Sequence, residues 1–236
     1  MFACTPLRRA RHLTALLLAL SALPLWAQVG PGAEQVARYG GLFAAAHKGD
    51  LPALDRLLAA KPEAATLNAR DSHGRTAVHV ATFARQREAL RRLIHAGADP
   101  QLLENDRYDA VTIAAVADDE DTLRVLLQLG ASARLTTSRY DGTALIAAAH
   151  LGHDGVVRQL IQAGAPLDHV NNLHWTAVIE AVVLGDGGPR HRATLRALLD
   201  AGASTQLADR NGRTPLELAR SRGYQEMVLM LEAAKR

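Results

Sequence analysis

The sequence predicts an all-α solenoid of about six stacked helix-turn-helix repeats. The first supporting observation is a Gly-Ala pair that recurs at intervals of 33, 34 and 38 residues, at Gly97–Ala98, Gly130–Ala131, Gly164–Ala165 and Gly202–Ala203. The second is a helix-starting residue that recurs in step with it, at Thr76, Asp109, Thr143, Thr176 and Thr214. Because two independent landmarks keep one period of about 33 residues, the pattern indicates a repeat protein rather than chance.

One repeat, within residues 140–168, shows most clearly how the sequence specifies its helices. Thr143 is a good N-cap for the first helix, and Gly152 ends that helix. The second helix stops at Gly164. Its apolar stripe consists of Val156, Val157, Leu160 and Ile161. Two helices this short cannot bury their apolar faces against each other alone, so the unit needs similar neighbours.

The period divides the chain into six repeats, at residues 39–71, 72–105, 106–138, 139–171, 172–209 and 210–236. Repeat one lacks the Gly-Ala stop, as a terminal cap does. Repeat five contains an enlarged turn, the insertion Gly185–Arg192, which explains the 38-residue spacing. Repeat six opens with Thr214, Pro215 and Glu217, which form a capping box with proline at the first helical position.

The N-terminus has the pattern of a secretory signal peptide over residues 1–27. A basic stretch, Arg8–Arg11, precedes an apolar run that is shorter than the ~20 residues of a membrane-spanning helix. We therefore expect cleavage after about Ala27, a periplasmic or secreted protein with no membrane span, and a short exposed linker over residues 28–38. An inner-membrane anchor is the alternative, because Leu25 is less typical near a cleavage site than a small residue.

Composition limits the classes of function. Residues 1–27 hold three of the 27 basic residues and no acidic ones, which leaves 24 basic residues against 24 acidic ones. This neutral balance gives no electrostatic footprint for nucleic acid. The single cysteine, Cys4, lies in the predicted signal. The mature chain therefore has no thiol for a disulfide, a nucleophile or a metal site.

The repeated motifs resemble those of the ankyrin repeat family. A Thr-Pro-Leu-His-x-Ala-like helix start appears at Thr76–Ala81 and Thr214–Ala219, and a Leu-Leu-x-x-Gly-Ala stop at Leu126–Ala131 and Leu198–Ala203. The resemblance covers about residues 39–236 and implies a solenoid with β-turn fingers that binds partners. With the predicted signal, it implies a non-catalytic protein–protein interaction module of the bacterial envelope. We expect a monomer that protects, inhibits or neutralises another protein in the periplasm.

The resemblance also indicates where a partner binds, because fingers and first helices line a concave face in an ankyrin stack. The family's contact positions map onto His73, Arg75, Phe83, Tyr108, Tyr140, His150, Leu151, Trp175, Leu184, Arg213 and Arg222. Four of these are aromatic in a chain with only 4% aromatic residues, and interface hot spots favour aromatics and arginine. The alternative is that the aromatic side chains pack between neighbouring fingers and only support the array.

No catalytic constellation stands out, so we expect the protein not to be an enzyme. The alternative is an enzyme, or a small-ligand or metal-binding protein, that uses the Gly185–Arg192 insertion with His150 and His153. The two histidines flank Gly152 at a repeat turn and lack a third ligand with matching spacing. The insertion lacks the strand–loop–helix context of a phosphate-binding loop. We therefore predict no cofactor and no metal.

An acidic run, Asp118–Asp121, has a structural explanation in the repeat period. Stepping back about 33 residues leads to Arg85 and Arg87 of repeat two. Stacked repeats bring such positions together, so we expect salt bridges between the two repeats. Each exposed pair contributes at most ~1 kcal/mol.

Overall fold

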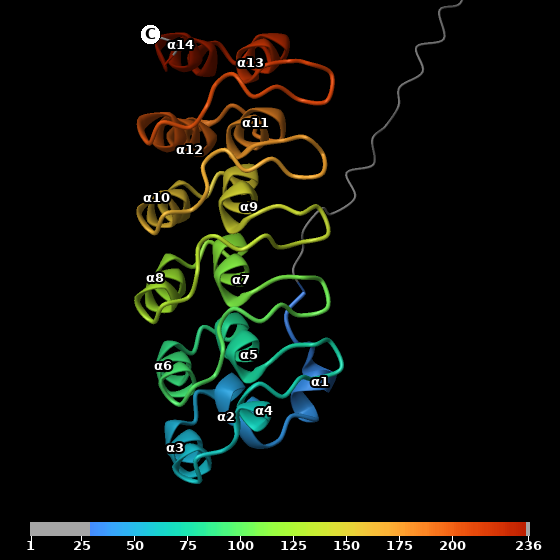
Figure 1. Cartoon of the computed structure of the whole chain (residues 1–236), viewed down its shortest axis with the longest axis vertical. Helices are drawn as coiled ribbons and strands as arrows, with labels where there is room; N and C mark the ends of the chain where they lie inside the picture. Colours follow the sequence, from blue (N-terminus) through green and yellow to red (C-terminus); the bar gives the residue numbers. More distant parts are fainter. Residues whose placement is uncertain (1–28, 235–236) are drawn as a thin grey trace, which may run out of the picture.

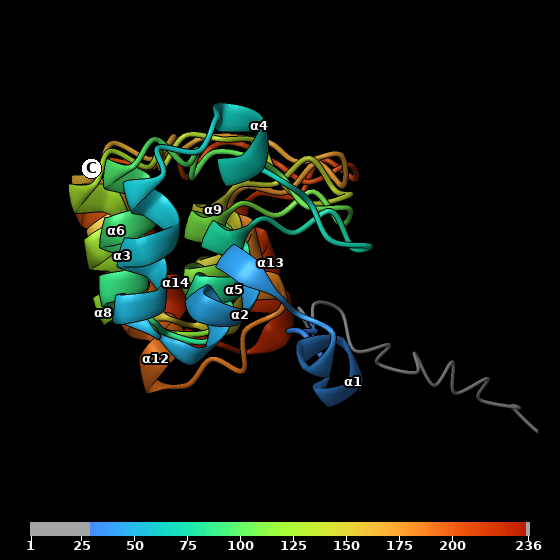
Figure 2. The ribbon, with the colours of Figure 1, turned by 90° about the horizontal axis from the view of Figure 1, so that it is seen from below.

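The computed structural model describes residues 29–234, which form a stack of helix pairs (Figure 1). Each repeat contributes an inner and an outer helix, and most are followed by a long loop that projects as a finger. Viewed along the stack, the outer helices, the inner helices and the fingers form successive layers (Figure 2). The predicted all-α repeat solenoid is confirmed. The predicted signal peptide lies outside the described residues.

The inner helices begin at the capping residues that the sequence marks. Asp109, Thr143, Thr176 and Thr214 each accept a hydrogen bond from the backbone N–H three residues later, which satisfies an amide that a helix start leaves unpaired. Thr76 is the N-cap of the repeat-two helix. The inner helices are α2 (Gly41–Lys48), α5 (Ala77–Phe83), α7 (Ala110–Val116), α9 (Ala144–Leu151), α11 (Ala177–Val183) and α13 (Pro215–Arg222).

The outer helices carry the predicted apolar stripe and bury it against the inner helices. They are α3 (Leu51–Ala59), α6 (Arg87–His95), α8 (Glu120–Gln128), α10 (Asp154–Gln162), α12 (Pro189–Asp200) and α14 (Gln225–Ala234). The glycines of the four Gly-Ala stops all have positive φ, the conformation that glycine adopts without a steric penalty. Repeat one instead continues into a short helix, α4 (Ala64–Leu67).

One hydrophobic core runs along the stack, between the two helical layers and between successive repeats. Alanines fill much of the inner layer; Ala81, Ala114, Ala148 and Ala181 are all fully or almost fully buried. Small side chains let neighbouring inner helices approach closely, while leucines from the outer helices fill the space between the layers. Each repeat therefore depends on its neighbours for burial, as expected for a solenoid.

The fingers are held by one hydrogen-bonding scheme that repeats along the stack. A polar side chain five residues before each N-cap accepts hydrogen bonds from backbone N–H groups of its own finger. These side chains belong to Asp71, Glu104, Ser138, Asn171 and Asp209. Backbone bonds then join adjacent fingers, for example from Asn172 N–H to the Tyr140 carbonyl at 2.9 Å. Residues 29–234 contain one isolated β-bridge, Thr137 to Gly142, and no strand.

The insertion in repeat five is more ordered than the predicted enlarged turn. Its second half, from Pro189, forms the first turn of α12, so only a short loop remains before that helix. The Arg190 guanidinium lies 2.7 Å from Asp118 of repeat three, and Arg192 pairs with Glu226 of repeat six. His191 contacts the His150 carbonyl of repeat four at 3.0 Å. The insertion therefore ties four repeats together.

The acidic run pairs with repeat two as predicted, although a step of 33 residues aligns Arg85 and Arg87 with Asp118 and Glu120 rather than with Asp119 and Asp121. Arg87 reaches Asp119 at 3.1 Å and Asp121 at 3.6 Å, and Arg85 also approaches Asp119 at 3.5 Å. Asp118 turns toward repeats four and five instead. Asp119 is the N-cap of α8 and is buried, so its carboxylate is both a capping group and an ion-pair partner.

Candidate functional site

The concave face between the fingers and the inner helices holds a pocket at repeats three to five. It is narrow: its interior space is about 20 Å³, on the order of what one water molecule requires. Val116 of α7 and Ile146 and Leu151 of α9 provide apolar walls. Tyr108 and Tyr140, each half-buried, come from the neighbouring fingers of repeats three and four. Four of the predicted partner-binding residues thus line this pocket: Tyr108, Tyr140, His150 and Leu151.

A buried polar cluster also lines the pocket. The carboxylate of Glu180, on α11, is only 2% exposed. One of its oxygens accepts a hydrogen bond from the Asn171 side-chain amide at 3.1 Å, and the other lies 3.1 Å from Nδ1 of His150. Because a buried carboxylate is costly unless it is paired and hydrogen-bonded, these two contacts explain how the fold tolerates Glu180 here.

Tyr108, which lines the pocket, stays uncharged over the ordinary range of pH. Burial raises the pKa of Tyr108 to about 12. Its ring therefore presents a neutral phenol and an aromatic face. The arrangement of two aromatic rings, apolar walls and one buried carboxylate is suited to binding a single side chain, because such pockets bury apolar surface around a few fixed polar groups.

At repeat two, the concave face is covered by the chain's own N-terminal segment, residues 29–39. Arg75 is 6% exposed and donates hydrogen bonds to the Val29 carbonyl and to the Gln35 side chain. Its guanidinium lies 5.2 Å from the centre of the Phe83 ring. The Gln35 side chain also lies 2.9 Å from Nδ1 of His73. His73 and Arg75 therefore contact this segment, and a side chain placed on Gly30 would meet the ring of Phe83.

This segment differs from the exposed linker that the sequence predicts for residues 28–38. It contains a short helix, α1 (Ala33–Ala37), on the finger side of α2 (Figure 1). Gln35 donates a hydrogen bond to Asp71 at 2.6 Å, and the Tyr39 hydroxyl donates to the same carboxylate at 2.9 Å. The missed signal is Gln35, whose amide both donates and accepts and so joins Asp71 to Arg75.

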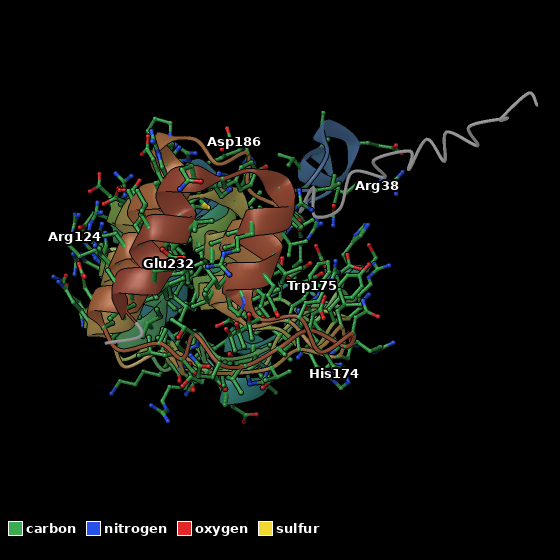
Figure 3. The ribbon with its side chains drawn as sticks, turned by 90° about the horizontal axis from the view of Figure 1, so that it is seen from above. Arg38, Arg124, His174, Trp175, Asp186 and Glu232 are labelled. Atoms are coloured by element: carbon green, nitrogen blue, oxygen red, sulfur yellow. The ribbon has the colours of Figure 1, made fainter. Side chains whose placement is uncertain are left out.

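The remaining predicted residues are more dispersed. Trp175 is half-buried and packs against the core, which favours the supporting role for this aromatic. Figure 3 places it and His174 on the finger side of the stack, away from Arg124 on the outer helices. Leu184 is exposed at the end of α11, and Arg222 is exposed at the end of α13. The Arg213 guanidinium pairs with Asp209 of its own finger at 2.9 Å.

The histidines and arginines suggested for an enzymatic, ligand-binding or metal-binding site each contact a different residue rather than a common centre. His150 contacts Glu180, whereas His153 lies 2.9 Å from the Ala115 carbonyl. Residues 29–234 contain no group of three or more His, Cys, Asp or Glu side chains placed to hold a metal ion. Arg190 and Arg192 of the insertion are paired with acidic residues rather than arranged around an open anion site.

Sequence reasoning missed Glu180 and Asn171 as residues of the site. A signal for Glu180 exists, because four residues after the N-cap the other repeats carry Val80, Ile113, Ala147 and Leu218. A carboxylate at a position that is otherwise apolar is unusual and marks repeat five. Asn171 has no comparable signal, since every finger carries a polar residue at its position.

Comparison with known proteins identifies the family. Models described as ankyrin repeats match residues 42–94 and 111–209. A putative ankyrin repeat protein of Escherichia coli K12, YahD, is 35% identical over 191 residues, which cover 80% of this chain and 93% of the relative. The chain belongs to the ankyrin repeat family. The predicted resemblance is thereby confirmed.

Solved structures agree with this ankyrin fold. An ankyrin repeat domain from Acinetobacter baumannii AYE is 41% identical, with a TM-score of 0.76, and the match covers 82% of this chain and 97% of that one. A chain in the complex of a predatory endopeptidase from Bdellovibrio bacteriovorus with an immunity protein gives a TM-score of 0.63 at 22% identity, over 83% of this chain and 98% of that one. The latter likeness concerns the fold alone. Within residues 29–234 of this ankyrin protein, none of the helices has the length and apolar character needed to cross a membrane.

Proposed function

We propose that this ankyrin repeat protein is a non-catalytic module that captures another protein through the concave face of repeats three to five. The observation that supports it most is the pocket lined by Tyr108 and Tyr140, which is preformed on a rigid stack. A preformed surface loses little conformational entropy on binding, and buried tyrosines are typical interface anchors. The N-terminal segment covers repeat two, so the proposed surface begins at repeat three.

The site of action in this proposal is the bacterial envelope. The support is the signal-like sequence of residues 1–27, with a basic stretch followed by a short apolar run. There the protein, as a monomer, protects, inhibits or neutralises a periplasmic partner. A complex of an endopeptidase with an immunity protein includes a chain of this fold. We therefore propose inhibition of a partner enzyme as one specific role.

Capture from a periplasmic extract tests the proposal. Purified protein is immobilised, and retained proteins are identified by mass spectrometry. We expect one partner to be retained by the wild type and to bind at least about tenfold more weakly to Tyr108→Ala and to Tyr140→Ala, because truncating an anchor at an interface commonly costs more than ~1.4 kcal/mol.

Arg124→Ala is the matched control, because Arg124 is exposed on outer helix α8 (Figure 3). This variant should retain the partner as well as the wild type does. Equal retention by both tyrosine variants, with folding unchanged by circular dichroism, would contradict the proposed surface.

A further inference from the structure

Glu180 lines the pocket at a position that the other repeats fill with apolar residues. Glu180 corresponds to Val80, Ile113 and Leu218, as the shared distance from the N-cap shows. Its partner His150 lies seven residues after Thr143, where repeats two, three and five carry Phe83, Val116 and Val183 but repeats one and six carry His47 and Ser221. The stack therefore tolerates a polar residue at the His150 position but does not need a carboxylate at the Glu180 position. Since burying a carboxylate lowers stability relative to an apolar residue, Glu180 suggests a binding role.

The carboxylate of Glu180 retains hydrogen-bonding capacity beyond its contacts with Asn171 and His150. An ionised carboxylate offers about four lone-pair sites, and these two residues use one on each oxygen. Because Glu180 lines the pocket and is surrounded by protein of low polarity, its interaction with an added charge is stronger than it would be in water.

The charged residues on the fingers beside the pocket form arginine–aspartate pairs, whose charges cancel. Glu180 is the acidic residue that lines the pocket itself. Arg107 pairs with Asp141 at 3.0 Å, and Arg139 pairs with Asp106 at 3.3 Å. These pairs are exposed and therefore contribute little net field. His150 is the one basic side chain among the residues that line the pocket.

We infer that this pocket binds a long basic side chain, lysine or arginine, that the protein partner presents; this inference rests on the proposed function. The alkyl part of such a side chain packs along Val116, Ile146 and Leu151, and its cationic end meets Glu180. The faces of Tyr108 and Tyr140 attract a cation as well. An acidic side chain meets repulsion from Glu180, and an apolar one buries that carboxylate further without compensation.

Titration with small probes tests the inference without the partner. Nα-acetyl-arginine amide, Nα-acetyl-lysine amide and the neutral Nα-acetyl-norleucine amide are added separately to the purified protein, and NMR follows the tyrosine ring resonances. Both cations should shift the resonances of Tyr108 and Tyr140 and bind at least about tenfold more tightly than the norleucine probe. Equal binding of the norleucine probe, or no shift at these rings with either cation, would overturn the inference.

Three variants make the test specific. Glu180→Gln keeps the shape but removes the charge, so the preference for the cations should disappear. Asp106→Asn removes one acidic charge from a finger beside the pocket and should leave that preference intact. Ala147→Leu narrows the pocket without changing its charge and should weaken all the probes; it replaces Glu180→Gln if the latter does not fold. Unchanged cation binding in folded Glu180→Gln or in Ala147→Leu would count against the inference.

The result can be separated from the fate of the proposed function. Cation binding at Glu180 without capture of any protein would support the pocket chemistry and contradict the interaction module. Capture of a partner that depends on Tyr108 and Tyr140, without binding of the cationic probes, would support the interaction module and contradict the inference that the pocket binds a basic side chain.

Discussion

The free energy of unfolding is expected to fall by about 3 kcal/mol as the pH drops from about 6.5 to about 4, because of His79. Burial lowers the pKa of this imidazole from 6.5 to about 4. A pKa difference of one unit corresponds to about 1.4 kcal/mol, which gives the size of the effect. His79 is only 1% exposed, in the inner layer of repeat two.

The hydrogen bonds of His79 explain why its charged form is disfavoured. Nδ1 accepts from the Thr76 backbone N–H at 3.1 Å, and Nε2 lies 3.2 Å from the Tyr108 carbonyl. This arrangement suits a neutral ring with its proton on Nε2, and a second proton on Nδ1 breaks the bond from Thr76. Between pH 6.5 and 4 the unfolded chain binds more protons than the folded one, so stability decreases as the pH falls through that window.

Urea unfolding at several pH values checks this prediction, with His79→Gln as the control. Glutamine at this helical position keeps the capping interaction without titrating. The variant should lose the decrease in unfolding free energy between pH 6.5 and 4. If His79→Gln keeps the same change in unfolding free energy between pH 6.5 and 4, the effect does not come from His79.

Asp119 and Asp209 affect stability in a separate pH window. Burial opposes the ionisation of both carboxyl groups. Hydrogen bonds nevertheless hold their pKa values below normal, from Thr122 and Arg87 to Asp119 and from Arg213 to Asp209. The stability they provide is lost below about pH 4.

Leu145→Ala should lower the free energy of unfolding by about 3 kcal/mol, the middle of the usual range for a buried leucine. Leu145 is completely buried on α9, whose neighbours in the inner layer are α7 and α11 (Figure 1). A cavity there weakens both interfaces of repeat four. In a one-dimensional stack this also weakens the coupling between the two halves, so we expect denaturation to become less cooperative.

Leu229→Ala is the matched control for Leu145→Ala. It removes the same atoms from an exposed leucine of α14, and the change in unfolding free energy should stay within about 0.5 kcal/mol. Chemical denaturation followed by circular dichroism measures both variants. Equal effects of the two substitutions would show that Leu145 does not join the neighbouring repeats.

The sequence predicts the stack well because each repeat carries its own local signals. Thr143 and Gly164 determine where helices start and stop, and the period then aligns all six repeats. Long-range side-chain contacts are less accessible to such reasoning. The period associates Asp118 with repeat two, but the insertion brings Arg190 close to it from 72 residues away.

The candidate site shows the same division. Tyr108, Tyr140, His150 and Leu151 were accessible by mapping family positions, because the period fixes which residues face the concave side. Their chemistry depends on Glu180, which becomes visible only when equivalent positions are compared across repeats. The covering of Arg75 by Val29 and Gln35 was inaccessible, because a docked terminal segment has no repeat to align with.

The central claim is that the partner binds the concave face of repeats three to five, and site-specific photo-crosslinking tests it most directly. A photoreactive phenylalanine analogue replaces Tyr140 in one variant and Arg124, on the opposite side of the stack, in another (Figure 3). The account predicts that the captured partner is crosslinked from position 140 and not from position 124. Crosslinking from position 124 and not from position 140 would contradict it.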